Sequence, residues 1–247
     1  DGRFILGLGS SHKVQVEPEH GVPYTKPLTR VRDTVAIVRA LLRDGEVDYD
    51  GEAIRIENFD LWFRPHRGDM PIYISALFPK MIRLCGEVSD GVILTRSTLD
   101  TAASIRPLIA EGASQAGRDP AKIDVTSLLP MAVADTLDAA RGIMRPGVAF
   151  YAGFFPRYNR LIAEYGFPGE AAAIAKAWAD GDRTGAARLV SDALVDATGI
   201  VGTPDDCRAR IAEYRESGLD LPIISPFARG PGAKELFEAA IRACAPD

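Results

Sequence analysis

The sequence is poor in cysteine and carries no surplus of positive charge. Its three cysteines, Cys85, Cys207 and Cys244, are scattered, and no C-x-x-C or H-E-x-x-H spacing occurs. A disulfide framework and a metal site are therefore not expected, and a reducing, cytoplasmic setting fits this cysteine content best. The net charge of −5 leaves no basic surface to hold a phosphate backbone, so nucleic-acid binding is not expected.

Long apolar runs and several familiar catalytic motifs are missing as well. The longest nearly uncharged stretches, such as residues 150–156, fall far short of the roughly 18 apolar residues that a membrane span needs. No signal peptide is expected, because residues 1–4 lead straight into an apolar strand pattern. The chain contains neither a Walker A motif nor a G-x-S-x-G nucleophile elbow. No membrane partner is therefore expected, and two common classes of enzyme site are disfavoured.

Short apolar runs alternate with amphipathic stretches along the chain. The apolar runs predict five buried strands, at 4–9, 71–76, 92–95, 123–133 and 221–225. Apolar spacing and helix-start signals predict helices at 28–42, 79–88, 99–116, 204–218 and 234–244. A helical region is predicted to start at 138–144, and the Ala-rich segment 170–197 is predicted to be helical. The remaining segments are predicted to be a loop at 10–26, a hairpin at 48–63 and an aromatic, irregular stretch at 147–169.

The repeated order of strand and helix predicts an α/β fold with a parallel sheet covered by helices. A doubly wound sheet and a (β/α)8 barrel both have this order. The glycines after the first strand read G-L-G-S-S-H. A dinucleotide-binding Rossmann unit needs G-x-G-x-x-G at the start of a helix. Because the third glycine is missing and a predicted loop comes before the next helix, the Rossmann alternative is disfavoured.

Several motifs resemble the luciferase-like monooxygenase superfamily. They are G-R-F-I-L-G-L-G-S at 2–10, Y-T-K-P-L at 24–28, P-I-Y-I-S-A at 71–76 followed by P-K-M at 79–81, E-V-S-D-G-V-I-L at 87–94, and G-T-P-D-D-C-R-A-R-I at 202–211. The branch that the chain resembles most uses the deazaflavin coenzyme F-420, as methylene-tetrahydromethanopterin reductases do.

The resemblance implies a (β/α)8 TIM barrel of the bacterial-luciferase type. In that scheme the chain enters at the fourth strand, so it lacks the first three βα units. The sequence also begins with Asp1 rather than Met. We therefore expect residues 1–247 to be one partial barrel domain of a longer enzyme, with a helical and aromatic insertion at about 147–197.

The resemblance also implies where the cofactor would bind, because barrel enzymes react at the C-terminal ends of their strands. Small residues after the first strand would run along the cofactor ring, and the helix start at Pro79, with Lys80, would contact its tail. Relatives often have glycine where this chain has Phe78. The candidates for cofactor binding are Gly7, Gly9, Ser10, Ser11, Ser75, Ala76, Leu77, Phe78, Pro79, Lys80 and Thr95. Plain turns between strand and helix are the alternative.

His12 is the catalytic candidate, since imidazole exchanges a proton near neutral pH. Some relatives carry an acidic residue at the matching place, and a surface histidine is the alternative. Arg96 could bind an acidic substrate or the acidic tail of the cofactor, or it could pair with Asp100. Phe154 and Phe155 would suit a lid over a hydrophobic substrate, or equally a contact in a homodimer.

By this resemblance, the expected function is oxidoreductase activity, with a hydride passing between coenzyme F-420 and an unidentified small organic substrate. His12 would manage a proton, and the cofactor would supply the redox chemistry. Two alternatives stay open. One is an FMN-dependent monooxygenase on the same barrel, and the other is a non-catalytic barrel fragment that binds a ligand or partner.

Overall fold

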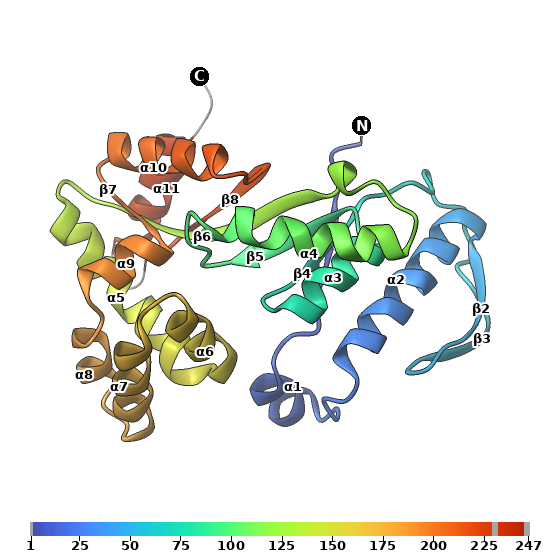
Figure 1. Ribbon diagram of the computed structural model, residues 1–247, viewed down its shortest axis with the longest axis horizontal. Coiled ribbons are helices and arrows are strands. Elements are labelled where there is room, and N and C mark those ends of the chain that lie inside the picture. Colours follow the sequence, from blue (N-terminus) through green and yellow to red (C-terminus); the bar gives the residue numbers. More distant parts are fainter. Residues whose placement is uncertain (1, 229–231, 245–247) are drawn as a thin grey trace. The chain divides into compact units, whose positions relative to one another are not determined.

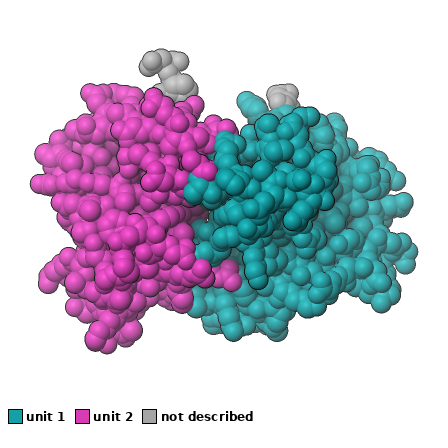
Figure 2. Space-filling view, viewed as in Figure 1, with its two compact units in different colours: residues 1–94, 104–126 teal, residues 95–103, 127–247 magenta. Residues whose placement is uncertain are grey.

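The computed structural model describes residues 2–228 and 232–244, which form two compact units (Figure 1, Figure 2). Unit 1 comprises residues 1–94 and 104–126, and unit 2 comprises residues 95–103 and 127–247. The chain passes from unit 1 to unit 2 after residue 94 and returns to unit 1 at residue 104. It enters unit 2 again after residue 126. None of the helices in the described part of the chain has both the length and the hydropathy that crossing a bilayer requires.

Unit 1 contains a parallel sheet with helices, and a separate hairpin. Its elements are β1 (Leu6–Leu8), α1 (Lys13–His20), α2 (Pro27–Asp44), β2 (Glu46–Asp50), β3 (Arg55–Asp60), β4 (Ile72–Ser75), α3 (Pro79–Val88), β5 (Gly91–Thr95), most of α4 (Thr101–Gln115), the 3-10 turn η1 (Pro120–Lys122) and the start of β6 (Asp124–Val133). Strand β4 lies between β1 and β5 and is parallel to both. The C-terminal ends of β1 and β4 therefore meet at one edge of the sheet.

The strands of unit 1 form a continuous apolar core. Ile72 and Ile74 of β4 and Val92 of β5 are fully buried, as expected for parallel strands that are covered on both faces. Helix α2 contributes Val31, Val35 and Ile37 to the buried residues, and it packs on α3 and on the hairpin strand β2.

Helices α3 and α4 cross at two glycines, Gly86 and Gly112. A Cβ on Gly112 would overlap the Arg83 carbonyl oxygen, and a Cβ on Gly86 would overlap the Ile109 carbonyl oxygen. The two backbones can approach this closely because neither glycine has a side chain. Helix α3 is thus fixed against α4 by its backbone as well as by side chains.

Unit 2 is mainly helical. Its elements are the rest of β6, α5 (Leu137–Phe154), α6 (Pro156–Glu164), α7 (Pro168–Ala179), α8 (Arg183–Arg188), α9 (Asp192–Thr198), β7 (Ile200–Gly202), α10 (Pro204–Glu216), β8 (Leu221–Pro226) and α11 (Ala233–Cys244). Strand β6 is parallel to β7, with Met131 opposite Ile200, and it also pairs with β8. Helix α10 begins with a capping box made by Thr203 and Asp206, so the helix start that the sequence predicts at residue 204 is confirmed.

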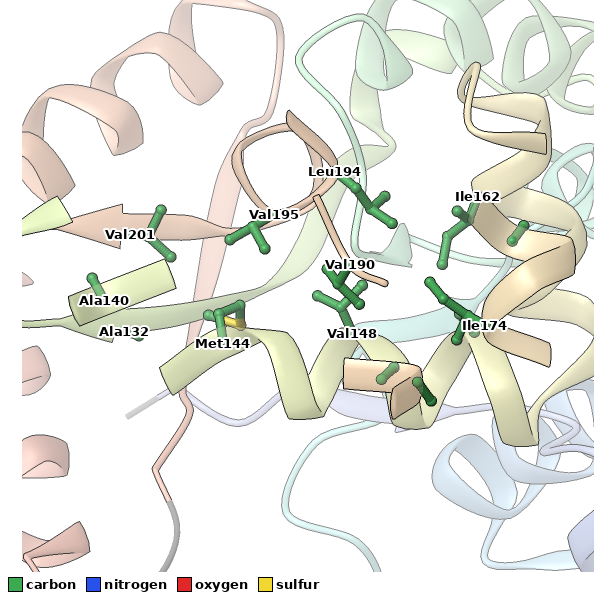
Figure 3. Close-up of a cluster of buried hydrophobic side chains, with 14 residues drawn as sticks. Ala132, Ala140, Met144, Val148, Ile162, Ile174, Val190, Leu194, Val195 and Val201 are labelled. Carbon is green, nitrogen blue, oxygen red and sulfur yellow. The ribbon is translucent and has the colours of Figure 1, made fainter. Parts of the chain in front are cut away.

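The core of unit 2 is built around α5 (Figure 3). Met144 and Val148 of this helix meet Ile174 from α7 and Leu194 from α9, and all four side chains are almost completely buried. Burial of side chains of this size is the main favourable contribution to folding. Helix α5 therefore organises the segment that the sequence predicts to be irregular.

The α/β class, the parallel pairing and the five predicted strands are confirmed, but two predictions are wrong. The predicted loop at 10–26 contains α1, which has no buried residue and so shows no apolar spacing. The predicted irregular stretch at 147–169 is the second half of α5 followed by α6. The helical segment predicted at 170–197 is confirmed and consists of α7, α8 and α9, with Asp182 and Ser191 as the N-caps of α8 and α9.

The error at 147–169 has a physical cause. Pro146 and two glycines suggest that a helix ends there, yet α5 continues through all three. A Cβ on Gly147 would lie 2.7 Å from the ring of Phe227, and one on Gly153 would overlap the ring of Trp178. These glycines admit aromatic rings and do not end the helix. Strand β7 is a sixth strand of the sheet, and it is not predicted because its apolar run, Ile200 and Val201, has only two residues and lies between glycines.

Candidate active site

In unit 1, the ends of β1 and β4 bring Gly9 and Ser75 together. A Cβ on Gly9 would lie 3.2 Å from the Cβ of Ser75. Gly7, Gly9 and Ser75 are all exposed, and residues two apart on a strand share a face. Three of the predicted cofactor residues thus form a flat surface whose largest side chain is a hydroxymethyl group.

The loop that follows β1 is held by Tyr24. The Tyr24 hydroxyl lies 3.0 Å from Ser10 Oγ and donates a hydrogen bond to the Ser11 carbonyl oxygen at 3.2 Å. Ser11 has a φ of 55°, a left-handed conformation that is unfavourable for a residue other than glycine. Tyr24 therefore supports a strained loop at the candidate site. This role of Tyr24 cannot be predicted from the sequence, because nothing in the spacing of the residues shows that its hydroxyl reaches residues 10 and 11.

His12 follows Ser11 and is the N-cap residue of α1. Its carbonyl oxygen accepts hydrogen bonds from the N–H groups of Gln15 and Val16, at 3.0 and 2.9 Å. The imidazole takes no part in capping the helix, and the residue is half-buried. The backbone of His12 is thus fixed by α1, while its side chain has no role in starting that helix.

A cavity of about 220 Å³ lies beside this loop. Its lining comes from the end of β1 (Leu8, Gly9 and Ser10), from α1 (Val16), from the loop before α2 (Val22, Pro23, Tyr24 and Thr25) and from the first turns of α2 (Pro27, Arg30, Val31 and Thr34). Pockets that enclose a whole drug-sized ligand measure roughly 300–1,000 Å³. The cavity therefore has room for part of such a ligand.

The second predicted cofactor segment, residues 75–80, leads from β4 into α3. Ala76 is buried, and its N–H donates to the Ile93 carbonyl oxygen at 3.0 Å. Phe78 is the N-cap of α3 and Pro79 its first residue, as the sequence predicts. Leu77 is half-buried, and Lys80 is exposed. The segment therefore presents a helix N-terminus and one solvent-exposed cation next to Ser75.

The remaining predicted residues lie in unit 2, where β5 ends. Arg96 has a φ of 54°, and its N–H donates to the Leu128 carbonyl oxygen at 3.2 Å. Two buried hydrogen bonds hold the next residue, from Ser97 Oγ to Ser127 Oγ at 2.7 Å and from the Tyr214 hydroxyl to the Ser97 carbonyl oxygen at 2.8 Å. The turn that carries Arg96 is thus both strained and tightly fixed.

The Arg96 side chain is buried against aromatic rings. It is 4% exposed, and its guanidinium carbon lies 4.2 Å from the centre of the Tyr151 ring. Burial lowers the pKa of Arg96 to about 10, and nearby Tyr151 and Tyr158 only partly oppose this shift. Within the described residues, Arg96 Nη1 is buried without a hydrogen-bond partner. The alternative pairing with Asp100 is not present.

The structure places Thr95, Phe154 and Phe155 in different surroundings. Thr95 forms a side-chain hydrogen bond with Tyr158, whose pKa is raised by burial despite that bond. Phe155 is 5% exposed, and its ring lies 4.8 Å from that of Phe154 and 5.4 Å from that of Tyr151. Phe155 thus packs inside an aromatic cluster at the junction of α5 and α6, while Phe154 is half-buried.

Comparison with known proteins places the chain in a family. The family model described as luciferase-like monooxygenase matches residues 1–221. The chain belongs to the luciferase-like monooxygenase family. The membership that the sequence motifs imply is therefore confirmed.

Relatives within the luciferase-like monooxygenase family include archaeal reductases. The chain is 36% identical over 241 residues to a 5,10-methylenetetrahydromethanopterin reductase of Methanolobus tindarius. The aligned part is 96% of this chain and 72% of that protein. It is 34% identical over 242 residues to the enzyme of the same name from Archaeoglobus fulgidus, with 96% and 71% of the two chains covered.

A solved structure shows the same fold. The coenzyme F-420-dependent tetrahydromethanopterin reductase of Methanopyrus kandleri superimposes with a TM-score of 0.83 and 27% identity, over 96% of this chain and 72% of that one. The expected bacterial-luciferase type of barrel fold is confirmed by this likeness. The Methanopyrus kandleri enzyme depends on F-420, so the expectation that the relatives of this chain include F-420-dependent oxidoreductases is confirmed.

Proposed function

We propose that the chain is an F-420-dependent reductase acting on a one-carbon unit carried by a tetrahydropterin. The observation that carries this proposal is the 36% identity, over 96% of the chain, to a methylenetetrahydromethanopterin reductase. The likeness to the F-420-dependent enzyme of Methanopyrus kandleri supports the choice of cofactor.

The residues at the end of the sheet in unit 1 fit a flat ring. Gly7, Gly9 and Ser75 leave the backbone accessible, and a larger side chain at residue 9 would meet Ser75. F-420, when bound, supplies the ring that gives or takes the hydride. The N-terminus of α3 and Lys80 offer positive charge to an acidic cofactor tail. These residues would thus orient the cofactor, and the strained loop at Ser11 would hold its shape without the ligand.

His12 and the residues of unit 2 complete the proposal. His12 would hold or deliver a proton at the substrate, because an imidazole can exchange a proton near neutral pH. Arg96, Phe154 and Phe155 would bind the substrate. A homodimer, which the resemblance implies, stays a prediction.

The direct test is a side-by-side titration of the chain with F-420 and with FMN, followed by cofactor fluorescence. We expect saturable binding of F-420 in preference to FMN, and oxidation of reduced F-420 when methylenetetrahydromethanopterin is added. His12→Gln should bind F-420 as tightly as the parent chain while turnover falls by roughly 10²–10⁴-fold, the usual contribution of general acid–base catalysis.

Other results would overturn the proposal. Saturable binding of FMN alone would favour the monooxygenase alternative, and binding of neither cofactor would favour the non-catalytic fragment. Unchanged turnover in His12→Gln would remove His12 from the mechanism and leave the choice of cofactor intact.

A further inference from the structure

Arg96 is a buried cation, and the part of the chain that the structure describes offers it no counter-charge. Its side chain is 4% exposed and Nη1 is completely buried, and among the described residues no carboxylate pairs with it and nothing accepts a hydrogen bond from Nη1. Transfer of a guanidinium out of water is strongly unfavourable unless the charge is paired and its N–H groups are bonded. The described residues do not meet these two requirements.

Other partly buried arginines of the chain have carboxylates that pair with their charge. Arg141, whose side chain is 16% exposed, lies near the carboxylates of Asp138, Asp192 and Asp196. Arg39 and Arg118 share the carboxylate of Asp90. Partly buried arginines in this molecule thus have acidic partners, and Arg96 departs from that pattern.

Arg183 shows that stacking on an aromatic ring does not require burial. Its guanidinium carbon lies 3.7 Å from the centre of the Trp178 ring, a geometry similar to that of Arg96 and Tyr151. Arg183 is nevertheless exposed and donates to the Trp178 carbonyl oxygen. The ring contact therefore does not by itself account for a buried and unpaired Arg96.

The backbone adds a second unfavourable feature at the same residue. Arg96 has a φ of 54°, and the hydrogen bonds to Leu128 and through Ser97 hold it there. Strained residues that the surrounding structure fixes in place are concentrated at ligand clamps and active sites. Arg96 thus combines a strained backbone with a buried charge that the described residues do not compensate. A residue that is held in place to bind a ligand would show both features.

We propose that Arg96 and the Tyr151 ring form a receptor for an anionic group, a carboxylate or a phosphate, of the bound ligand. The ring holds the guanidinium plane, and Nη1 donates to the anion. Arginine suits this role because its planar N–H groups match both anions. Two sources would bring such a group, the substrate or the acidic tail of the cofactor. The choice between them rests on the proposed function, whereas the anion site itself does not.

Inorganic phosphate and acetate are the probes for the site, tested at constant ionic strength and without cofactor. We expect the Tm of the parent chain to rise saturably with either anion, because a ligand that binds only the folded state stabilises it. Arg96→Met should lose this rise. Without anion its Tm should equal or exceed that of the parent, since an unpaired buried charge has been removed. Arg183→Met, which removes the exposed stacked arginine, should keep the rise.

Three results would overturn the proposal. They are no saturable rise in the parent chain, the same rise in Arg96→Met, or loss of the rise in Arg183→Met as well. Should Arg96→Met fail to fold, Arg96→Lys serves instead, because it keeps the charge but not the planar donor. It should then retain a weaker, still saturable response.

A second measurement distinguishes the two sources of the anion. The parent chain and Arg96→Met are titrated with F-420 and with the deazaflavin nucleoside that lacks the acidic tail. If the tail supplies the anion, Arg96→Met weakens F-420 binding by about 10- to 100-fold, the effect of losing a charged hydrogen bond, and leaves the nucleoside unaffected. If the substrate supplies it, both affinities stay the same and the KM of the substrate rises.

The two proposals can fail separately. If neither cofactor form binds the parent chain, the proposed function fails, and the response of Tm to phosphate still decides the anion site. If F-420 binds and turns over but no anion changes Tm, the receptor is wrong and the reductase stands.

Discussion

Asp33 shows how one side chain can join two elements of unit 1. It lies on α2 with 3% of its surface exposed. Its carboxylate accepts hydrogen bonds from the Tyr49 hydroxyl at 2.9 Å and from the N–H groups of Ala53 and Ile54 at 2.8 and 3.0 Å. Burial alone would raise the pKa of Asp33, but these three hydrogen bonds outweigh it and lower the pKa. The carboxylate is thus ionised and fastens the hairpin turn to α2.

Replacing this carboxylate should cost stability. Asp33→Asn has nearly the same shape but removes the charge and one acceptor oxygen, so either the Tyr49 hydroxyl or the N–H groups of Ala53 and Ile54 lose their acceptor. We expect the free energy of unfolding to fall by about 1–3 kcal/mol, measured by urea unfolding at pH 7. Glu46→Gln is the control, because Glu46 is exposed on the neighbouring strand and should change stability by no more than about 0.5 kcal/mol. Equal effects of the two variants would contradict the role given to Asp33.

At the scale of elements, the crossing of α3 and α4 depends on backbone contact. Gly86 and Gly112 face the backbone of the opposite helix, so a methyl group at either position meets atoms that cannot rotate away. Gly142 in α5 provides the contrast, since it is exposed and a Cβ there would meet no atom within 4 Å.

The same substitution at these two helical glycines should have opposite effects. Gly112→Ala should destabilise the protein by about 1–3 kcal/mol, because an added methyl group forces the helices apart. Gly142→Ala should stabilise it by about 0.5–1 kcal/mol, because alanine favours the helix and meets no obstacle. Thermal and urea unfolding of the two variants measure this. A destabilised Gly142→Ala, or a stable Gly112→Ala, would contradict the packing described.

Elements were predictable where local signals and burial agree. Helix α3 begins at Pro79 and ends at Val88, as predicted, because proline starts it and its apolar face is buried. Helix α1 buries nothing, so its residues carry no apolar spacing. The glycines within α5 are explained only by Phe227 and Trp178, which are distant in sequence. Local pattern therefore identifies amphipathic elements and fails where a distant side chain decides.

The candidate site divides in the same way. Gly9 and Ser75 were predictable as neighbours, since parallel strands end at one edge of a sheet. Arg96 was predictable as the residue after a strand, but its burial against the Tyr151 ring depends on α5, which is distant in sequence. Tyr24 was missed because its bonds to residues 10 and 11 depend on the fold of the intervening helix.

For the whole molecule, the ionised carboxylates predict how stability depends on pH. The pKa of Asp33 is lowered by its hydrogen bonds despite burial, and that of Asp206 by its hydrogen bonds with Thr203. A lowered pKa contributes stability that is fully present above the unfolded pKa, about 3.9 for aspartate, and is lost as the pH falls through the folded value.

We therefore expect the urea midpoint to be nearly constant from pH 7 to pH 5 and to fall below about pH 4. Urea unfolding at a series of pH values measures this, and Asp33→Asn should show a shallower fall than the parent chain. A midpoint that rises on acidification, or the same pH profile in Asp33→Asn, would contradict the assignment.

The glycine contact between α3 and α4 has a consequence for how this sequence can diverge over time. Helix α3 carries Phe78, Pro79 and Lys80 in its first turn, and its position is set by a contact near its other end. Most surface positions of α3 can exchange residues freely, whereas a change at Gly86 or Gly112 would displace the first turn together with the rest of the helix. Natural variation should therefore be narrow at these two glycines even though neither lies at the candidate site.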